Sequence, residues 1–346
     1  MTLDLDTFLV ALYTTVDDLY QEHFAPLKPI RPGPRTTLGD SEVVTIIVCA
    51  QYFGQSERWL VRYAGEHWRT YFPNLLSQSA TNRRARDLAG VFRGLVHLLA
   101  TRLGAASAPY QVLDGLPVQL MRRCRGTKHR LFADEAAIGK GGSDKDWYYG
   151  CKMLLAVSNE GVITGFTLGP ASTEERWLAE YFLCWRQDCA ATPRGTEDFP
   201  PSHRKGGGYV GPTGRIWPRD GAGQIPSRLY ITDGGFSGEN WVGYWASDYQ
   251  ALILTPESYH GPSYRPPAHG GENAEQMKKQ HARWRHVIET VNEHLEHAFH
   301  LPYPGARTFW GLYTRVAAKL AAFNISVCLA RLFGHPDFGF ATLFSC

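Results

Sequence analysis

Apolar positions at helical spacing dominate the first hundred residues. In the segment 79–103, apolar residues recur every three or four positions from Leu88 to Leu99, which predicts a helix with one buried face. A second apolar run follows Asp40 and Ser41, and either residue is a suitable helix cap. We therefore expect residues 1–104 to be helical.

After a short linker at 104–109, the pattern changes to short runs rich in β-branched and aromatic residues, which predicts strands. The sequence Asn159-Glu160-Gly161 between two of these runs is a good hairpin turn. The helix after the hairpin carries acidic residues in its first turn, where they complement the helix dipole. The predicted strands are 110–120, two runs within 147–170, 228–235 and 249–256, and the predicted helices are 172–187, 274–299 and 307–333.

This order predicts an α/β fold in which a mixed sheet is flanked by helices. We expect a helical region at 1–104, a sheet domain at 105–305 and a C-terminal helix within 306–346 that packs on the core. The sheet domain contains a Gly/Pro-rich insertion at 190–227, and so long a segment is either functional or a tolerated surface insertion.

Composition fits a globular protein, with 44% hydrophobic and 20% charged residues among 346. The net charge of +3 is too small to indicate nucleic acid by itself. Seven cysteines without a CxxC pair are typical of a reduced compartment. No run of 18 apolar residues is present, and the first ten residues carry acids where a signal peptide would carry bases. We expect a cytoplasmic protein without a membrane segment.

Two aspartates are predicted to end strands, Asp114 before Gly115 and Asp233 before a Gly-Gly pair. If their strands are parallel neighbours, these carboxylates meet at one edge of the sheet. Glu289 borders the apolar face of helix 274–299, with Arg285 four residues before it and Asn292 three residues after it.

Three converging carboxylates suit two Mg²⁺ or Mn²⁺ ions, which prefer oxygen ligands and support phosphoryl transfer. Simpler readings stay open, since an aspartate before glycine is often a turn residue and Glu289 could be a solvated helix position. Glu293 and Glu296 are rival candidates on nearby faces.

Several motifs resemble those of the DDE transposases of bacterial insertion sequences. They are LDG at 113–115, DWYYGCKMLLAVSNEGVITGFTLGPAS at 146–172, ITDGG at 231–235 and RHVIETVNEHLEHAF at 285–299, with LGDSEVVTIIV at 38–48 and RVAAKLAAFN at 315–324. The resemblance covers most of the chain. It departs from many relatives at Ala282 and Glu296, where they carry Tyr and Lys.

The resemblance implies an RNase H-like catalytic core at 105–305 and a DNA-binding or dimerisation role for 1–104. It implies Asp114, Asp233 and Glu289 as catalytic and metal-binding residues. The expected partners are the double-stranded DNA of the element ends and of the target, with a homodimer forming on DNA and a location at the bacterial nucleoid.

Basic residues gather where phosphate contacts would be needed. The densest stretch, 121–130, contains no acid and follows Asp114 in sequence, so we expect it beside the metals. A solvated basic loop is the alternative. The predicted DNA-binding residues are Arg83, Arg84, Arg86, Arg122, Arg123, Arg125, Lys128, Arg130, Lys278, Lys279, Arg285 and Asn292.

The expected function is transposition. The protein would bind terminal inverted repeats, cleave the element ends and join the 3′-hydroxyls to target DNA by two-metal phosphoryl transfer. Alternatives are a metal-dependent nuclease that does not join, and a non-catalytic DNA-binding protein derived from a transposase. A structural zinc module built on His294, His297 and His300 is a weaker alternative, because three-residue steps drift around a helix.

Overall fold

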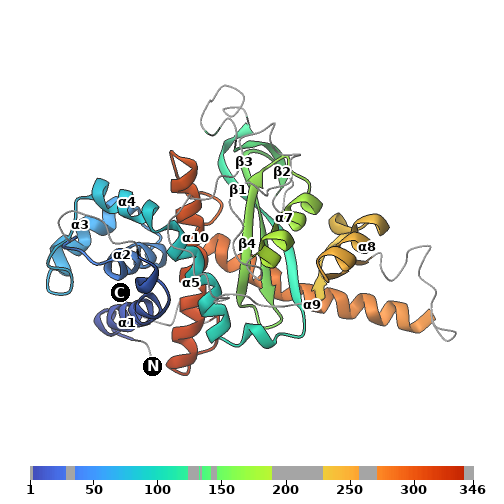
Figure 1. The fold of residues 1–346 in the computed structure, drawn as a ribbon, viewed down its shortest axis with the longest axis horizontal. Coiled ribbons are helices and arrows are strands. Elements are labelled where there is room, and N and C mark those ends of the chain that lie inside the picture. Colours follow the sequence, from blue (N-terminus) through green and yellow to red (C-terminus); the bar gives the residue numbers. More distant parts are fainter. Residues whose placement is uncertain are drawn as a thin grey trace. The chain divides into compact units, whose positions relative to one another are not determined.

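The computed structural model describes residues 3–28, 36–123, 132, 135–141, 146–188, 229–256 and 271–338. Within these ranges the side chains of 106, 146, 187, 188, 239, 271–275, 277 and 278 are not described. The described chain forms two units (Figure 1). The helical unit contains residues up to 103 and from 295 onward, and the sheet unit contains the residues from 104 to 294. The insertion predicted at 190–227 lies outside the described residues.

The described residues of the helical unit begin with five α-helices, in the region 1–104 that we expect to be helical. Polar side chains cap several of them: Asp4 accepts from the backbone N–H of Thr7 in front of α1, and Ser56 accepts from that of Trp59 in front of α3. Asp40 is the first helical residue of α2 and is not its cap, which is Gly39. The helices are α1 (Leu5–His23), α2 (Asp40–Tyr52), α3 (Glu57–His67), α4 (Gln78–Asp87) and α5 (Ala89–Arg102).

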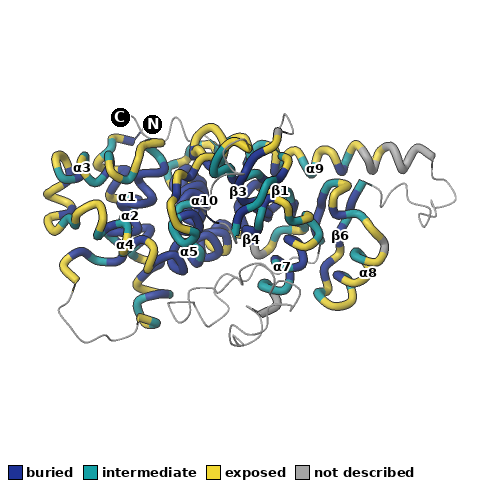
Figure 2. Tube along the Cα trace, turned by 90° about the horizontal axis from the view of Figure 1, so that it is seen from above, coloured by how far each residue is buried: buried dark blue, intermediate teal, exposed yellow. Residues whose placement is uncertain are grey.

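The C-terminal helix α10 (Phe309–Leu332) belongs to the helical unit, where it packs against α5 and α2. A C-terminal helix that packs on the core was expected within 306–346, and α10 is apolar nearly all round and buried among the other helices of this unit (Figure 2). Its length and composition would allow it to cross a membrane, but 89% of its most apolar window is buried, as in a core helix. Arg315 ties it to α3 through two 2.7 Å contacts with Glu57.

The sheet unit contains a mixed sheet, which confirms the predicted α/β class. The long strand β3 (Asp146–Ser158) runs antiparallel to β1 (Gln111–Arg122) along one edge. Two shorter strands pair with the other edge of β3, and both are antiparallel to it. The first part of β3 pairs with β2 (Ala137–Gly141), and the rest pairs with β4 (Ile163–Pro170). On the far side of β1, the short strands β5 (Leu229–Ile231) and β6 (Leu252–Leu254) add in parallel.

Helices cover both faces of this sheet. Figures 1 and 2 show α7 (Glu175–Asp188) and α9 (Gly271–His297) on opposite faces, and α8 (Glu239–Asp248) connects β5 to β6. Beneath α7 and α8 a fully buried apolar cluster includes Leu113, Phe182 and Trp245. Because side chains alternate along a strand, Leu113 and Gly115 face α7, while Asp114 faces α9.

Candidate metal and phosphate site

Asp114 and Asp233 lie at matching levels of two neighbouring parallel strands. Val112 of β1 pairs with Ile231 of β5, and each aspartate follows two residues later. Adjacent strands run about 4.8 Å apart, so this register brings the two carboxylates together. We expected Asp114 to end its strand, and that is wrong, because β3 continues to pair with β1 as far as Arg122. It is β5 that ends here.

Helix α9 supplies two polar partners to Asp114. The Asn292 Nδ2 donates to Asp114 Oδ2 at 2.9 Å, and an Arg285 Nη2 lies 3.8 Å from Asp114 Oδ1. Burial nevertheless raises the pKa of Asp114 to about 6. The Arg285 charge opposes this rise, and the Asp233 and Glu175 charges add to it. Arg285 and Asn292, which we expected on the side of the helix that carries Glu289, are therefore the residues of α9 that contact Asp114.

Glu175, the first residue of α7, is a third carboxylate in this neighbourhood, and the sequence analysis missed it. Its side chain is 26% exposed, and its Oε1 lies 3.6 Å from Lys152 Nζ. Burial raises the pKa of Glu175, and the charge of Asp233 raises it further. The sequence does show acidic residues in the first turn of the helix after the hairpin. We interpreted them only as partners of the helix dipole and not as residues of a site.

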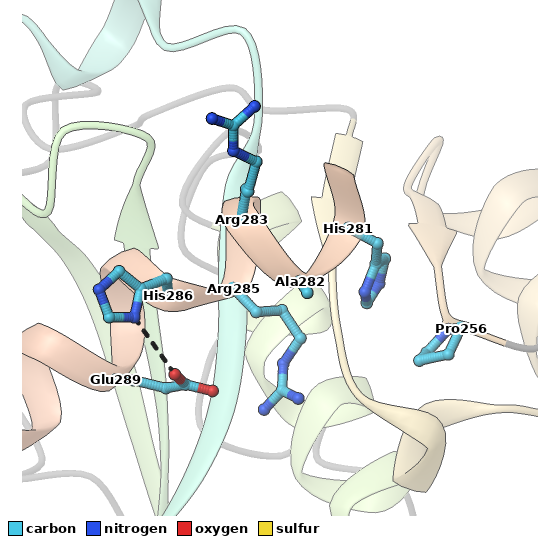
Figure 3. A pocket seen from close by; sticks show the side chains of 7 residues that line it. All are labelled: Pro256, His281, Ala282, Arg283, Arg285, His286 and Glu289. Atoms are coloured by element: carbon cyan, nitrogen blue, oxygen red, sulfur yellow. Dashed lines mark hydrogen bonds and ion pairs between the residues drawn. The ribbon is translucent and has the colours of Figure 1, made fainter. Parts of the chain in front are cut away.

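Glu289, the third predicted ligand, is placed differently. Its side chain is 57% exposed, and its Oε2 lies 3.5 Å from His286 Nδ1. It lines a pocket of about 640 Å³ together with Arg285 and His281 (Figure 3). The Arg285 and Glu289 side chains point to the same side of α9, and Arg283 points away (Figure 3). Glu289 thus lines the same pocket as Arg285, which contacts Asp114. None of the described contacts of Glu289 is with Asp114 or Asp233.

The basic stretch 121–130 does not begin beside the acids. Arg122 is eight residues beyond Asp114 on β1, which corresponds to as much as about 26 Å of extended strand. Our expectation that this charge lies next to the acids is wrong for Arg122 and Arg123, because the strand continues past Asp114. The Arg123 guanidinium instead lies 4.9 Å from the centre of the exposed Trp147 ring. Arg125, Lys128 and Arg130 fall outside the described residues.

The other predicted DNA contacts differ in their exposure. Arg84 is turned inward, where it pairs with the buried Asp40 of α2. Arg83 and Arg86 on the same helix are exposed, as is Lys279 on α9. The Lys278 side chain is outside the described set. DNA contact by these residues stays a prediction.

The residues around Asp114 fit a hard divalent cation. Carboxylate oxygens are the donors that Mg²⁺ and Mn²⁺ prefer. Asn292 Oδ1 is buried and has no hydrogen-bond partner in the described part of the chain, so the site holds an unsatisfied oxygen as well. Over the same part of the chain, no three His, Cys, Asp or Glu side chains are already grouped closely enough to hold a metal.

No protein-family model, curated protein or solved structure matches this chain. The sheet, the paired aspartates and their neighbours are therefore the features that indicate a function.

Proposed function

We propose that this protein is a metal-dependent DNA transposase with an RNase H-like sheet unit. The observation that carries the proposal is the matched level of Asp114 and Asp233 on adjacent parallel strands. Two carboxylates at that spacing, one with a pKa raised to about 6, repel each other unless a cation lies between them. The resemblance of the surrounding motifs to those of DDE transposases supports DNA as the substrate.

Each residue has a role in this proposal. Asp114 and Asp233 would hold Mg²⁺ or Mn²⁺, and Glu289 would complete the set by turning its exposed side chain from His286 toward the two aspartates. Two bound ions would activate the attacking oxygen and stabilise the leaving one. Asn292 orients Asp114 through its 2.9 Å hydrogen bond. Arg285, which faces both Asp114 and the pocket, neutralises a phosphate of the scissile strand.

The wider setting follows from the reaction. The protein would bind the inverted repeats of its element, cut a phosphodiester at each end and join the 3′-hydroxyls to target DNA. Working on two ends calls for a homodimer on DNA. Such an enzyme would act at the nucleoid in the bacterial cytoplasm, with the helical unit contributing DNA contacts through exposed bases such as Arg83 and Arg86.

Cleavage and joining of a plasmid that carries the DNA flanking this gene would test the proposal. The wild type should cut at the repeat ends and form joined products with Mg²⁺ or Mn²⁺, and should do neither in EDTA. Asp233→Asn should abolish both activities. Asp248→Asn on the exposed surface of α8 is the matched control and should keep them.

Other outcomes would point elsewhere. Cutting without joined products would indicate a metal-dependent nuclease. Specific binding without cutting by the wild type, in conditions that support a related enzyme, would indicate a non-catalytic DNA-binding protein.

A further inference from the structure

The carboxylate of Glu175 lies against two glycines, and each glycine follows one of the paired aspartates within two residues. A Cβ built on Gly115, directly after Asp114, would lie 3.0 Å from Glu175 Oε1. A Cβ built on Gly235, two residues after Asp233, would lie 2.2 Å from Glu175 Oε2. The absence of side chains at these two positions is therefore what lets the carboxylate reach the aspartates.

This position is electrostatically unfavourable for an acid unless positive charge is supplied. Glu175 is partly buried, and the carboxylates of Asp114 and Asp233 are neighbouring like charges. Lys152 at 3.6 Å and the more distant Arg285 offset part of this cost. The three carboxylates carry one more charge than these two cations when all are ionised, and a divalent cation would supply the missing positive charge.

The neighbouring glutamates are not placed in this way. Glu174 is 63% exposed and forms a surface pair with Arg176 at 3.1 Å. Glu289 is 57% exposed and lies beside His286. Glu175 is the most enclosed of the three, since its side chain is 26% exposed and its carboxylate lies against Gly115 and Gly235.

We infer that Glu175 is a further carboxylate ligand of the divalent cation held by Asp114 and Asp233. It approaches from the α7 face of the sheet, while Asn292 and Arg285 approach from the α9 face. The inference rests on the proposed function and adds a ligand that the transposase motifs do not assign. A purely structural alternative is that Glu175 only joins α7 to β3 through Lys152.

Mn²⁺ binding to the purified full-length protein, followed by electron paramagnetic resonance of the free ion, separates these possibilities without any DNA. Asp233→Asn should abolish the site. Glu175→Gln should weaken Mn²⁺ binding at least tenfold, the lower end of the effect seen for outer-shell groups. Glu174→Gln, the matched control at the adjacent exposed position, should leave the affinity unchanged.

The outcomes distinguish the two proposals. If the wild type binds no Mn²⁺, or if Asp233→Asn binds it as the wild type does, the metal site of the proposed function is refuted. If Asp233→Asn loses binding but Glu175→Gln keeps wild-type affinity, the inference about Glu175 is overturned and the proposed function stands.

Two further variants guard against a folding artefact. Gly115→Ala keeps every charge, and the three atoms nearest the new Cβ all belong to Glu175, so it displaces that carboxylate by a few tenths of an ångström. We expect several-fold weaker Mn²⁺ binding, and unchanged affinity would contradict the inference. Lys152→Met should lower the melting temperature yet keep Mn²⁺ affinity at or above that of the wild type. A loss of affinity equal to that of Glu175→Gln would favour the structural alternative.

Discussion

Replacing Asp114 with Asn should stabilise the metal-free protein, even though it removes a residue that the proposed reaction requires. The Asp114 side chain is 19% exposed, and burial is the main reason why its pKa rises to about 6. The Arg285 charge offsets only part of this effect. The ionised carboxylate is thus a net cost to folding, and an amide of the same shape avoids it.

The size of the effect follows from the pKa. The rise from 3.8 to about 6 is roughly two units, and each unit corresponds to about 1.4 kcal/mol. The upper bound is therefore about 3 kcal/mol. The folded protein binds the proton more tightly than the unfolded chain, so the cost is fully present above pH 6. It disappears as the pH falls from about 6 to about 4.

Urea denaturation in EDTA measures this gain. At a pH of about 8, Asp114→Asn should raise the free energy of unfolding of the sheet unit by about 1–3 kcal/mol. The difference in free energy of unfolding between the variant and the wild type should be smaller at a pH of about 5. It should also be smaller when Mg²⁺ is added, because the ion would stabilise the wild type. Glu174→Gln should leave stability unchanged. An Asp114→Asn protein that is no more stable than the wild type in EDTA would refute the reasoning.

Two more predictions concern groups away from the acids. Glu180 accepts hydrogen bonds from Tyr244 at 3.0 Å, from Trp245 at 2.7 Å and from Tyr249. Glu180→Gln should therefore lower the free energy of unfolding by about 2–4 kcal/mol and speed hydrogen exchange in α8. Unchanged exchange would contradict this prediction. Burial lowers the pKa of Lys319 on α10 to about 8, so its contribution to stability should increase between a pH of about 8 and about 10.5. Melting temperatures of the wild type and Lys319→Met across that range should show the rise in the wild type alone.

The sequence predicted the elements whose pattern is strong. The β3–β4 hairpin, the helices on the two faces of the sheet and the apolar helix α10 were all expected, because periodicity and turn residues mark them locally. The strand β2 was missed because Ala137–Gly141 contains two glycines and no alternation. The helix α8 was missed because Glu239–Asp248 is short and interrupted by Gly243.

The candidate site was only partly predictable, since its geometry depends on pairing between distant segments. The two aspartates could be chosen from their positions near strand ends, although Asp114 lies within β1 and gains its role from the early end of β5. Glu175 could not be selected, because its place between Gly115 and Gly235 exists only after α7 packs on the sheet. The contacts of Glu289 likewise depend on tertiary structure, so the spacing of residues along α9 does not predict them.

The pairing of β1 with β5 sets the spacing of the two aspartates, and this spacing does not depend on how many residues connect α7 to β5. The Gln111–Tyr230 and Val112–Ile231 pairs set the level of Asp233 against Asp114, whatever the number of residues between Asp188 at the end of α7 and Leu229 at the start of β5. A slip of one residue in that pairing would instead turn Asp233 to the opposite face of the sheet. An insertion or deletion within the three residues of β5 would therefore separate the two aspartates.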